Sequence, residues 1–111
     1  MADQHDAQLI LQLSQWATQM GMDEATRVVM SESFYPEKAT ADDPNVGRVL
    51  MWYETVGTLT KNKLLDTELV LDWIWVAGMW AKVRHAALQA REKTGVKEMY
   101  ENFEALASAG R

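Results

Sequence analysis

Residues 48–80 read RVLMWYETVGTLTKNKLLDTELVLDWIWVAGMW and decide the fold of this 111-residue chain. Apolar side chains recur at helical spacing up to the polar break at Lys61-Asn62-Lys63, and Asp66 then stands where it can cap a second helix. Residues 69–80 are apolar on almost every side, which is typical of a helix enclosed by its neighbours. The stretch therefore predicts a helical hairpin with one buried member.

Helical periodicity extends on the N-terminal side of this hairpin. It predicts an amphipathic helix over residues 6–20, ended by Gly21, and a second helix that Asp23 caps and that stops near residue 33. A loop over residues 36–43 follows, and Asp43-Pro44 is a strong start for the next helix. The face that this helix turns to the core is predicted to hold Val46, Val49, Leu50, Tyr53, Val56, Gly57 and Thr60.

On the C-terminal side, the helix capped by Asp66 is predicted to continue to Gly95. A last helix follows, with its apolar face at Val96, Met99, Tyr100, Phe103, Leu106 and Ala107. The chain is short enough for one domain over residues 1–111, with frayed ends at 1–5 and 108–111. We therefore expect an all-α fold, a compact bundle of four to five helices with a long, largely buried fourth helix.

Composition and charge restrict the class of protein. The chain has no Cys, no signal-peptide pattern and no apolar run of the roughly 18–20 residues that cross a bilayer, so we expect a soluble, cytoplasmic protein without membrane contact. A net charge of -5 disfavours nucleic-acid binding. Such binding would require one basic face made of Lys82, Arg84, Arg91, Lys93 and Lys97.

Few residues offer chemistry. With two His and no motif for a metal, a nucleotide or a nucleophile, we expect no metal, no cofactor and no catalytic residue, and therefore a protein that is not an enzyme. The alternative is a ligand-binding or enzymatic bundle with a pocket around Tyr53, Glu54, Gly57 and Asp72. Gly57 has a simpler explanation in the close approach of another helix, and the two acids in ion pairs or contact with solvent.

Five Trp are many for a bundle of this size. Trp is enriched where proteins contact one another, although ordinary core packing also explains such residues. We expect a non-enzymatic interaction or oligomerisation module, either a homodimer or bound to another protein. Its predicted interface residues are Trp52, Trp75 and Met79.

The chain also resembles a bacterial family of small helical domains that is known only as a domain of unknown function. The resemblance rests on Tyr53-Glu54, Gly57, Leu59, Asp66, Leu69-Val70 and the segment YENFE at residues 100–104. It covers about residues 9–107 and implies the fold, but no reaction. Many members place a membrane helix ahead of the domain, which this sequence lacks, and the family's basic turn usually carries Gly where this chain has Asn62-Lys63.

Overall fold

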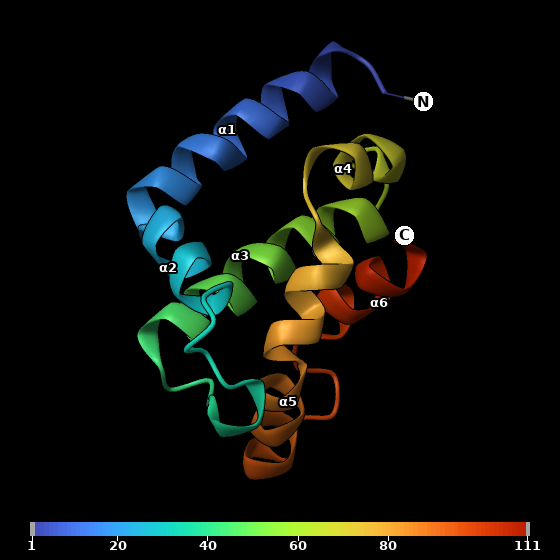
Figure 1. Ribbon diagram of the computed structural model, residues 1–111. Coiled ribbons are helices and arrows are strands. Elements are labelled where there is room, and N and C mark those ends of the chain that lie inside the picture. The colour runs from blue at the N-terminus through green and yellow to red at the C-terminus, as the bar shows by residue number, and fades with distance from the viewer. Residues whose placement is uncertain (1, 111) are drawn as a thin grey trace.

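The structure is a computed structural model that describes residues 2–110, and over these it holds six α-helices, one 3-10 helix and no strand. The helices are α1 (Gln4–Met20), α2 (Met22–Val29), α3 (Pro44–Lys61), α4 (Thr67–Trp73), α5 (Val76–Thr94) and α6 (Glu101–Ala109), with the 3-10 helix η1 at Pro36–Lys38 (Figure 1). The radius of gyration is 13.6 Å, close to the value of about 13 Å for a compact domain of this length. The all-α prediction is confirmed.

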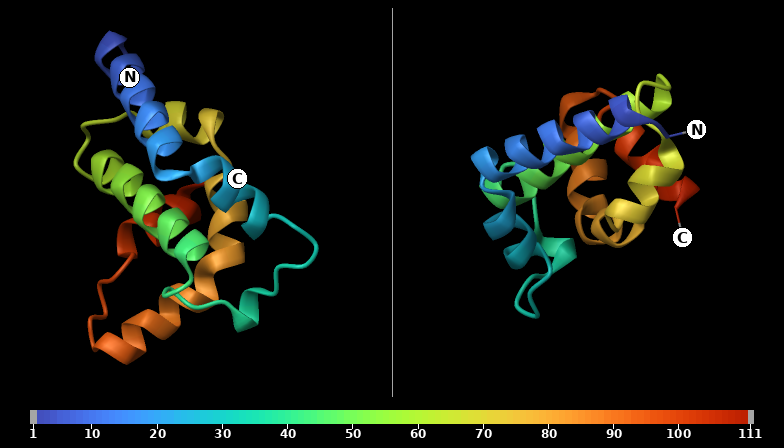
Figure 2. Two further views of the ribbon diagram at one scale, coloured as in Figure 1. Left: turned by 90° about the vertical axis from the view of Figure 1, so that its left-hand side faces the viewer. Right: turned by 90° about the horizontal axis from the view of Figure 1, so that it is seen from above.

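Helix α3 lies at the centre and contacts α2, α5 and α6 (Figures 1 and 2). It starts as predicted, because the Asp43 carboxylate accepts hydrogen bonds from the amides of Asn45 and Val46 and Pro44 occupies the first turn. Every residue predicted on its core face is buried. The prediction of these residues is confirmed, and Trp52, which was not predicted among them, is buried as well.

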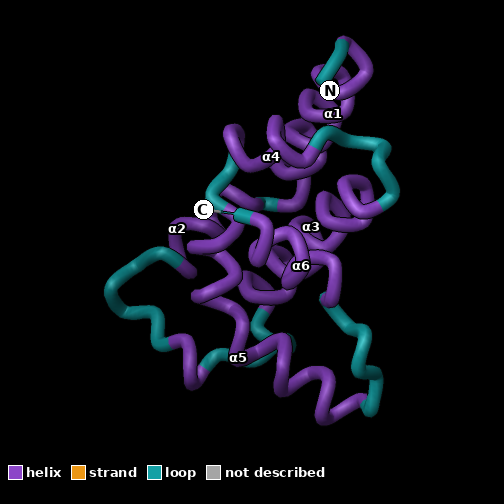
Figure 3. Tube along the Cα trace, turned by 90° about the vertical axis from the view of Figure 1, so that its right-hand side faces the viewer, coloured by secondary structure: helices purple, strands orange, loops and turns teal. Residues whose placement is uncertain are grey.

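The predicted long fourth helix is wrong, because the chain breaks it between α4 and α5. Asp66 caps α4 as predicted, but Ile74 and Trp75 leave the helical conformation, with ψ angles of 153° and 79°. The helices α4 and α5 therefore run in different directions (Figures 1 and 3). Val70 of α4 and Val76 of α5 both belong to one core. A single straight helix with apolar residues on all sides would leave part of that surface in water, and the break avoids this loss. This break gives six helices instead of four or five.

Three other boundaries differ from their predictions. Helix α2 ends at Val29 instead of residue 33, and Gly21, with φ 81°, stands at its start in place of Asp23. Helix α6 begins only at Glu101, so Val96 lies in an exposed loop. The ends expected to fray are helical from Gln4 and up to Ala109, while residues 1 and 111 lie outside the described residues. Over residues 2–110, no helix combines the length and the apolar character that crossing a bilayer requires.

Asp6 connects two parts of the chain that lie sixty positions apart. Its carboxylate accepts a hydrogen bond from the amide of Asp3, at 2.8 Å, within the capping box of α1. The other carboxylate oxygen accepts one from the amide of Asp66, also at 2.8 Å, at the start of α4. These two amides, that of Asp3 first, hold the pKa of the Asp6 carboxyl below its ordinary value of 3.8.

Asp6→Asn is therefore expected to lower the free energy of unfolding at pH 7 and to matter less in acid. A lowered pKa in the folded state means that the carboxylate stabilises the fold above about pH 4, and that this contribution is lost as the pH falls through the folded-state pKa. Urea unfolding of both proteins, followed by circular dichroism at pH 7, 4 and 3, measures the difference between them. A difference that stays constant over this range would contradict the assignment.

Candidate functional site

Glu54, which we predicted in a pocket, instead caps helix α6. The N-cap position of α6 is Tyr100, whose side chain makes no capping hydrogen bond. One carboxylate oxygen of Glu54 accepts the amide of Phe103 at 2.8 Å, and the other accepts the side-chain amide of Asn102 at 2.9 Å. A negative carboxylate at the N-terminal end of a helix also interacts favourably with the positive end of the helix dipole. Glu54 therefore supplies from α3 the cap that the sequence of α6 lacks.

Gly57 lies one turn further along α3, under the same end of α6. A Cβ atom at this position would lie 2.5 Å from the carbonyl oxygen of Asn102 and 2.6 Å from its carbonyl carbon. The backbones of α3 and α6 thus touch where Gly57 has no side chain, and Lys61 continues the contact with an ion pair to Glu101 at 3.8 Å. Close helix approach, the simpler of the two explanations for Gly57, is the one that the structure supports.

The structure does not bring the four predicted pocket residues together. Asp72 is exposed on α4, whereas Glu54 and Gly57 lie under α6. The ring of Tyr53 stacks on Phe103, with 4.9 Å between the ring centroids. Tyr53 also lines a separate groove, to which Glu54, Gly57 and Asp72 do not contribute. Of the residues predicted at an interface, only Trp75 is exposed, at 61%; Trp52 and Met79 are each 3% exposed and belong to the core.

A groove of about 380 Å³ opens between α1 and α2 on one side and the junction of α4 and α5 on the other. We call it the Tyr53 groove. Its apolar lining includes Ala17, Met22, Trp52, Trp73 and Ile74, and polar groups stand around these. The volume falls within the range of about 300–1,000 Å³ that is usual for small-molecule sites.

The polar groups of the Tyr53 groove are four side chains besides Tyr53. Asp23 of α2 is exposed, so its carboxylate lies in contact with solvent. The other three are hydroxyls, contributed by Ser14, Thr18 and Thr26. Thr18 already donates its hydroxyl to the carbonyl oxygen of Ser14 at 3.2 Å.

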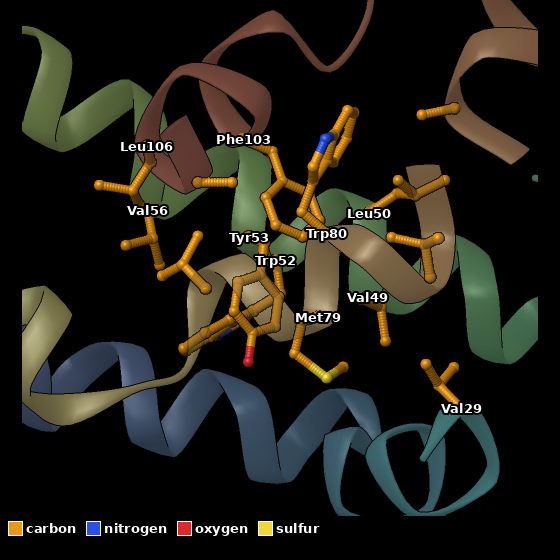
Figure 4. Close-up of a cluster of buried hydrophobic side chains, with 14 of the residues drawn as sticks. Val29, Val49, Leu50, Trp52, Tyr53, Val56, Met79, Trp80, Phe103 and Leu106 are labelled. Atoms are coloured by element: carbon orange, nitrogen blue, oxygen red, sulfur yellow. The ribbon is translucent and has the colours of Figure 1, made fainter. Parts of the chain in front are cut away.

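Tyr53 is only 6% exposed, and its hydroxyl has no hydrogen-bond partner among the described residues. Since every fully buried polar side-chain atom of these residues has a partner, the hydroxyl keeps contact with solvent. Figure 4 shows its oxygen on the side of the ring that faces α1, where the Tyr53 groove lies. Burial raises the pKa of Tyr53 to about 12, so the phenol is protonated at neutral pH. Periodicity predicted Tyr53 on the core face of α3, but nothing in the sequence placed α1 and the α4–α5 break around it.

A larger hollow of about 690 Å³ lies at the other end of the molecule, between the loop before α3, the end of α5 and the segment before α6. Its walls are joined by the exposed pair Lys93–Asp42 at 3.3 Å. Beside it, Arg91 donates to the carbonyl oxygen of Met99 at 2.7 Å and pairs with Glu104 at 2.8 Å. Because Lys93 pairs with Asp42 and Arg91 pairs with Glu104, none of these four side chains is free to bind a ligand in the hollow.

The remaining chemistry is sparse. Over residues 2–110, no group of three His, Asp or Glu side chains is placed to hold a metal ion. Both histidines are exposed, and His85 lies on the outer side of α5. Of the five bases that a nucleic-acid face would need, Arg91 and Lys93 are paired with acids.

Comparison with known proteins agrees with the resemblance seen in the sequence. No curated protein and no solved structure matches the chain significantly. One family does match, over residues 3–109, and thus over nearly the whole chain, including both the α3 segment with Glu54 and the α6 segment that it caps. The chain belongs to this family, which is described as a domain of unknown function, DUF4760.

Proposed function

We propose that the domain is a non-catalytic interaction module that associates with a second copy of itself, with Trp75 as the anchor of the contact. The observation that carries this proposal is the placement of the Trp75 indole, which is 61% exposed and yet packed against its own helix. Exposed aromatic anchors of this kind account for much of the binding energy at protein interfaces.

The α4–α5 break and Gly78 together determine where this indole lies. Trp75 stands at the break, and a Cβ atom on Gly78 would lie 2.3 Å from two of its ring carbons. One face of the indole therefore covers the backbone at Gly78, and the rest of the side chain remains exposed. An indole that is ordered before contact loses little conformational freedom on binding, which favours association.

The uneven distribution of charge along the chain and the hydrogen bonds of two carboxylates support the same proposal. Residues 1–47 carry a net charge of -6 and residues 48–111 a net charge of +1, so unlike parts of two copies attract each other. Asp6 is buried and Glu54 is partly buried, and the carboxylates of both accept backbone hydrogen bonds. These two carboxylates therefore hold the fold and are not free to act as general bases.

Trp75→Ala is expected to weaken self-association at least about tenfold while changing the free energy of unfolding by less than about 1 kcal/mol, since the side chain is mostly exposed. Sedimentation equilibrium over a range of concentrations measures the first quantity, and urea unfolding measures the second.

Leu11→Ala is the matched control, because Leu11 of α1 is an apolar side chain with a similar exposed fraction, 64%, elsewhere on the surface. It is expected to leave self-association unchanged. A wild-type protein that stays monomeric up to millimolar concentration would overturn the proposal, and so would an equal effect of the two substitutions.

A further inference from the structure

We propose that the Tyr53 groove binds a small, neutral aromatic molecule that carries one hydrogen-bonding group. The proposal goes beyond self-association through Trp75 and does not depend on it. It rests on an aromatic groove of suitable size and on the hydroxyl of the mostly buried Tyr53, which faces that groove, is accessible to solvent and has no partner among the described residues.

The aromatic walls of the groove are held in place by the fold. The indole nitrogen of Trp52 donates to the carbonyl oxygen of Leu13 at 3.0 Å, which ties α3 to α1. Trp73 packs edge-to-face on Trp52, with ring centroids 5.6 Å apart, and Tyr53 also packs edge-to-face on Trp52, at 5.0 Å. A flat apolar ligand therefore meets rings that are already ordered, so little conformational freedom is lost on binding.

The floor of the groove selects a ligand by hydrogen bonding. A ligand in the groove would cover the Tyr53 hydroxyl, and a hydroxyl removed from water without a hydrogen-bond partner is unfavourable. Tyr53 lacks such a partner within residues 2–110, and a ligand that donates to or accepts from its oxygen provides one. A specific polar contact at the floor of an apolar site orients the ligand.

The groove favours a neutral ligand over a charged one. The exposed carboxylate of Asp23 stands on the groove and repels anions. The burial that raises the pKa of the Tyr53 phenol also disfavours a cation at the floor, because a cation would lose part of its hydration there. A neutral aromatic molecule avoids both losses.

Indole and 1-methylindole test the proposal, because they share one shape and only indole has an N–H to donate to the Tyr53 oxygen. Titration of the full chain is followed by two-dimensional ¹H–¹⁵N NMR of the Trp52 and Trp73 side chains. We expect saturable shifts of both signals, with indole binding about tenfold more tightly than 1-methylindole.

Tyr53→Phe removes the hydroxyl and keeps the ring, so it is expected to abolish the preference for indole and to leave the binding of 1-methylindole unchanged. Tyr100→Phe, outside the groove, is the control and is expected to retain the preference. Ala17→Leu, which places a larger side chain in the groove, is expected to abolish the binding of both compounds.

Four results would overturn the proposal. They are the absence of saturable shifts, equal affinities of wild type for the two compounds, a preference that survives in Tyr53→Phe, and binding that appears only in Trp75→Ala. The last result would mean that the indole of a second copy fills the groove. Binding of indole by wild type together with a strictly monomeric protein would support this proposal and contradict self-association, so the two proposals fail separately.

Discussion

Phe103→Ala is expected to lower the free energy of unfolding by about 3–5 kcal/mol, the largest loss of any single truncation proposed for this chain. Phe103 is 0% exposed and lies where α3, α5 and α6 meet (Figure 4). Its ring stacks on Tyr53 at 4.9 Å and meets Trp80 edge-to-face at 5.0 Å. Its removal therefore takes away buried apolar surface and two aromatic contacts, and leaves a cavity between three helices.

Urea unfolding followed by circular dichroism measures this loss, with Tyr35→Ala as the control. Tyr35 is also aromatic, but it is 59% exposed and its ring contacts Lys38 at 5.3 Å on the surface. Its truncation is expected to change the free energy of unfolding by less than about 1 kcal/mol. Similar effects of the two substitutions would contradict the assignment of Phe103 to the centre of the core.

The parts of this fold that the sequence predicted are those with local causes. Asp43 and Asp66 cap the helices that they were expected to cap, and Gly21 and Gly95 end theirs with φ angles of 81° and 76°. The predicted residues of the buried face of α3 are all buried, since their periodicity follows from the geometry of one helix, and only Trp52 of that helix's buried residues was missed. Such signals depend on neighbours within about one helical turn.

The parts that were missed have tertiary causes. Nothing local announces the break at Ile74 and Trp75, where the chain contains neither Pro nor Gly, because the break serves the burial of two differently directed helices against one core. The start of α6 was placed too early for a related reason. Tyr100 adopts φ 62°, which is unfavourable for a side chain, and the cap that allows α6 to begin after it comes from Glu54, 46 positions earlier.

The two segments that carry the family resemblance are thus partners in one contact. Glu54 and Gly57 of the first segment meet Asn102 and Phe103 of the second, by capping and by close backbone approach. Sequence alone identified both segments but gave no reason for their joint presence. The contact explains them as structural requirements of α3 and α6, and the Tyr53 hydroxyl is not part of this contact.

Gly57→Ala is expected to lower the free energy of unfolding by about 2–3 kcal/mol, as an overpacking substitution does when rigid groups surround the site. The added methyl group would lie 2.5 Å from the Asn102 carbonyl oxygen and 3.0 Å from the Phe103 nitrogen. Both atoms belong to the backbone of α6, so relief requires movement of the whole helix end. That movement also lengthens the hydrogen bond from Phe103 to Glu54.

Gly78→Ala is the matched comparison, because it makes the same change inside another helix, with an even shorter approach of 2.3 Å. There the obstacle is the ring of Trp75, an exposed side chain that can rotate away. Alanine is also favoured over glycine inside a helix by about 1 kcal/mol, so Gly78→Ala is expected to change the free energy of unfolding little, or to raise it. Since helix propensity is common to both substitutions, their difference in urea unfolding isolates the rigidity of the neighbour. Equal effects would mean that the end of α6 yields as easily as a surface side chain, and that Gly57 is not required for the contact between α3 and α6.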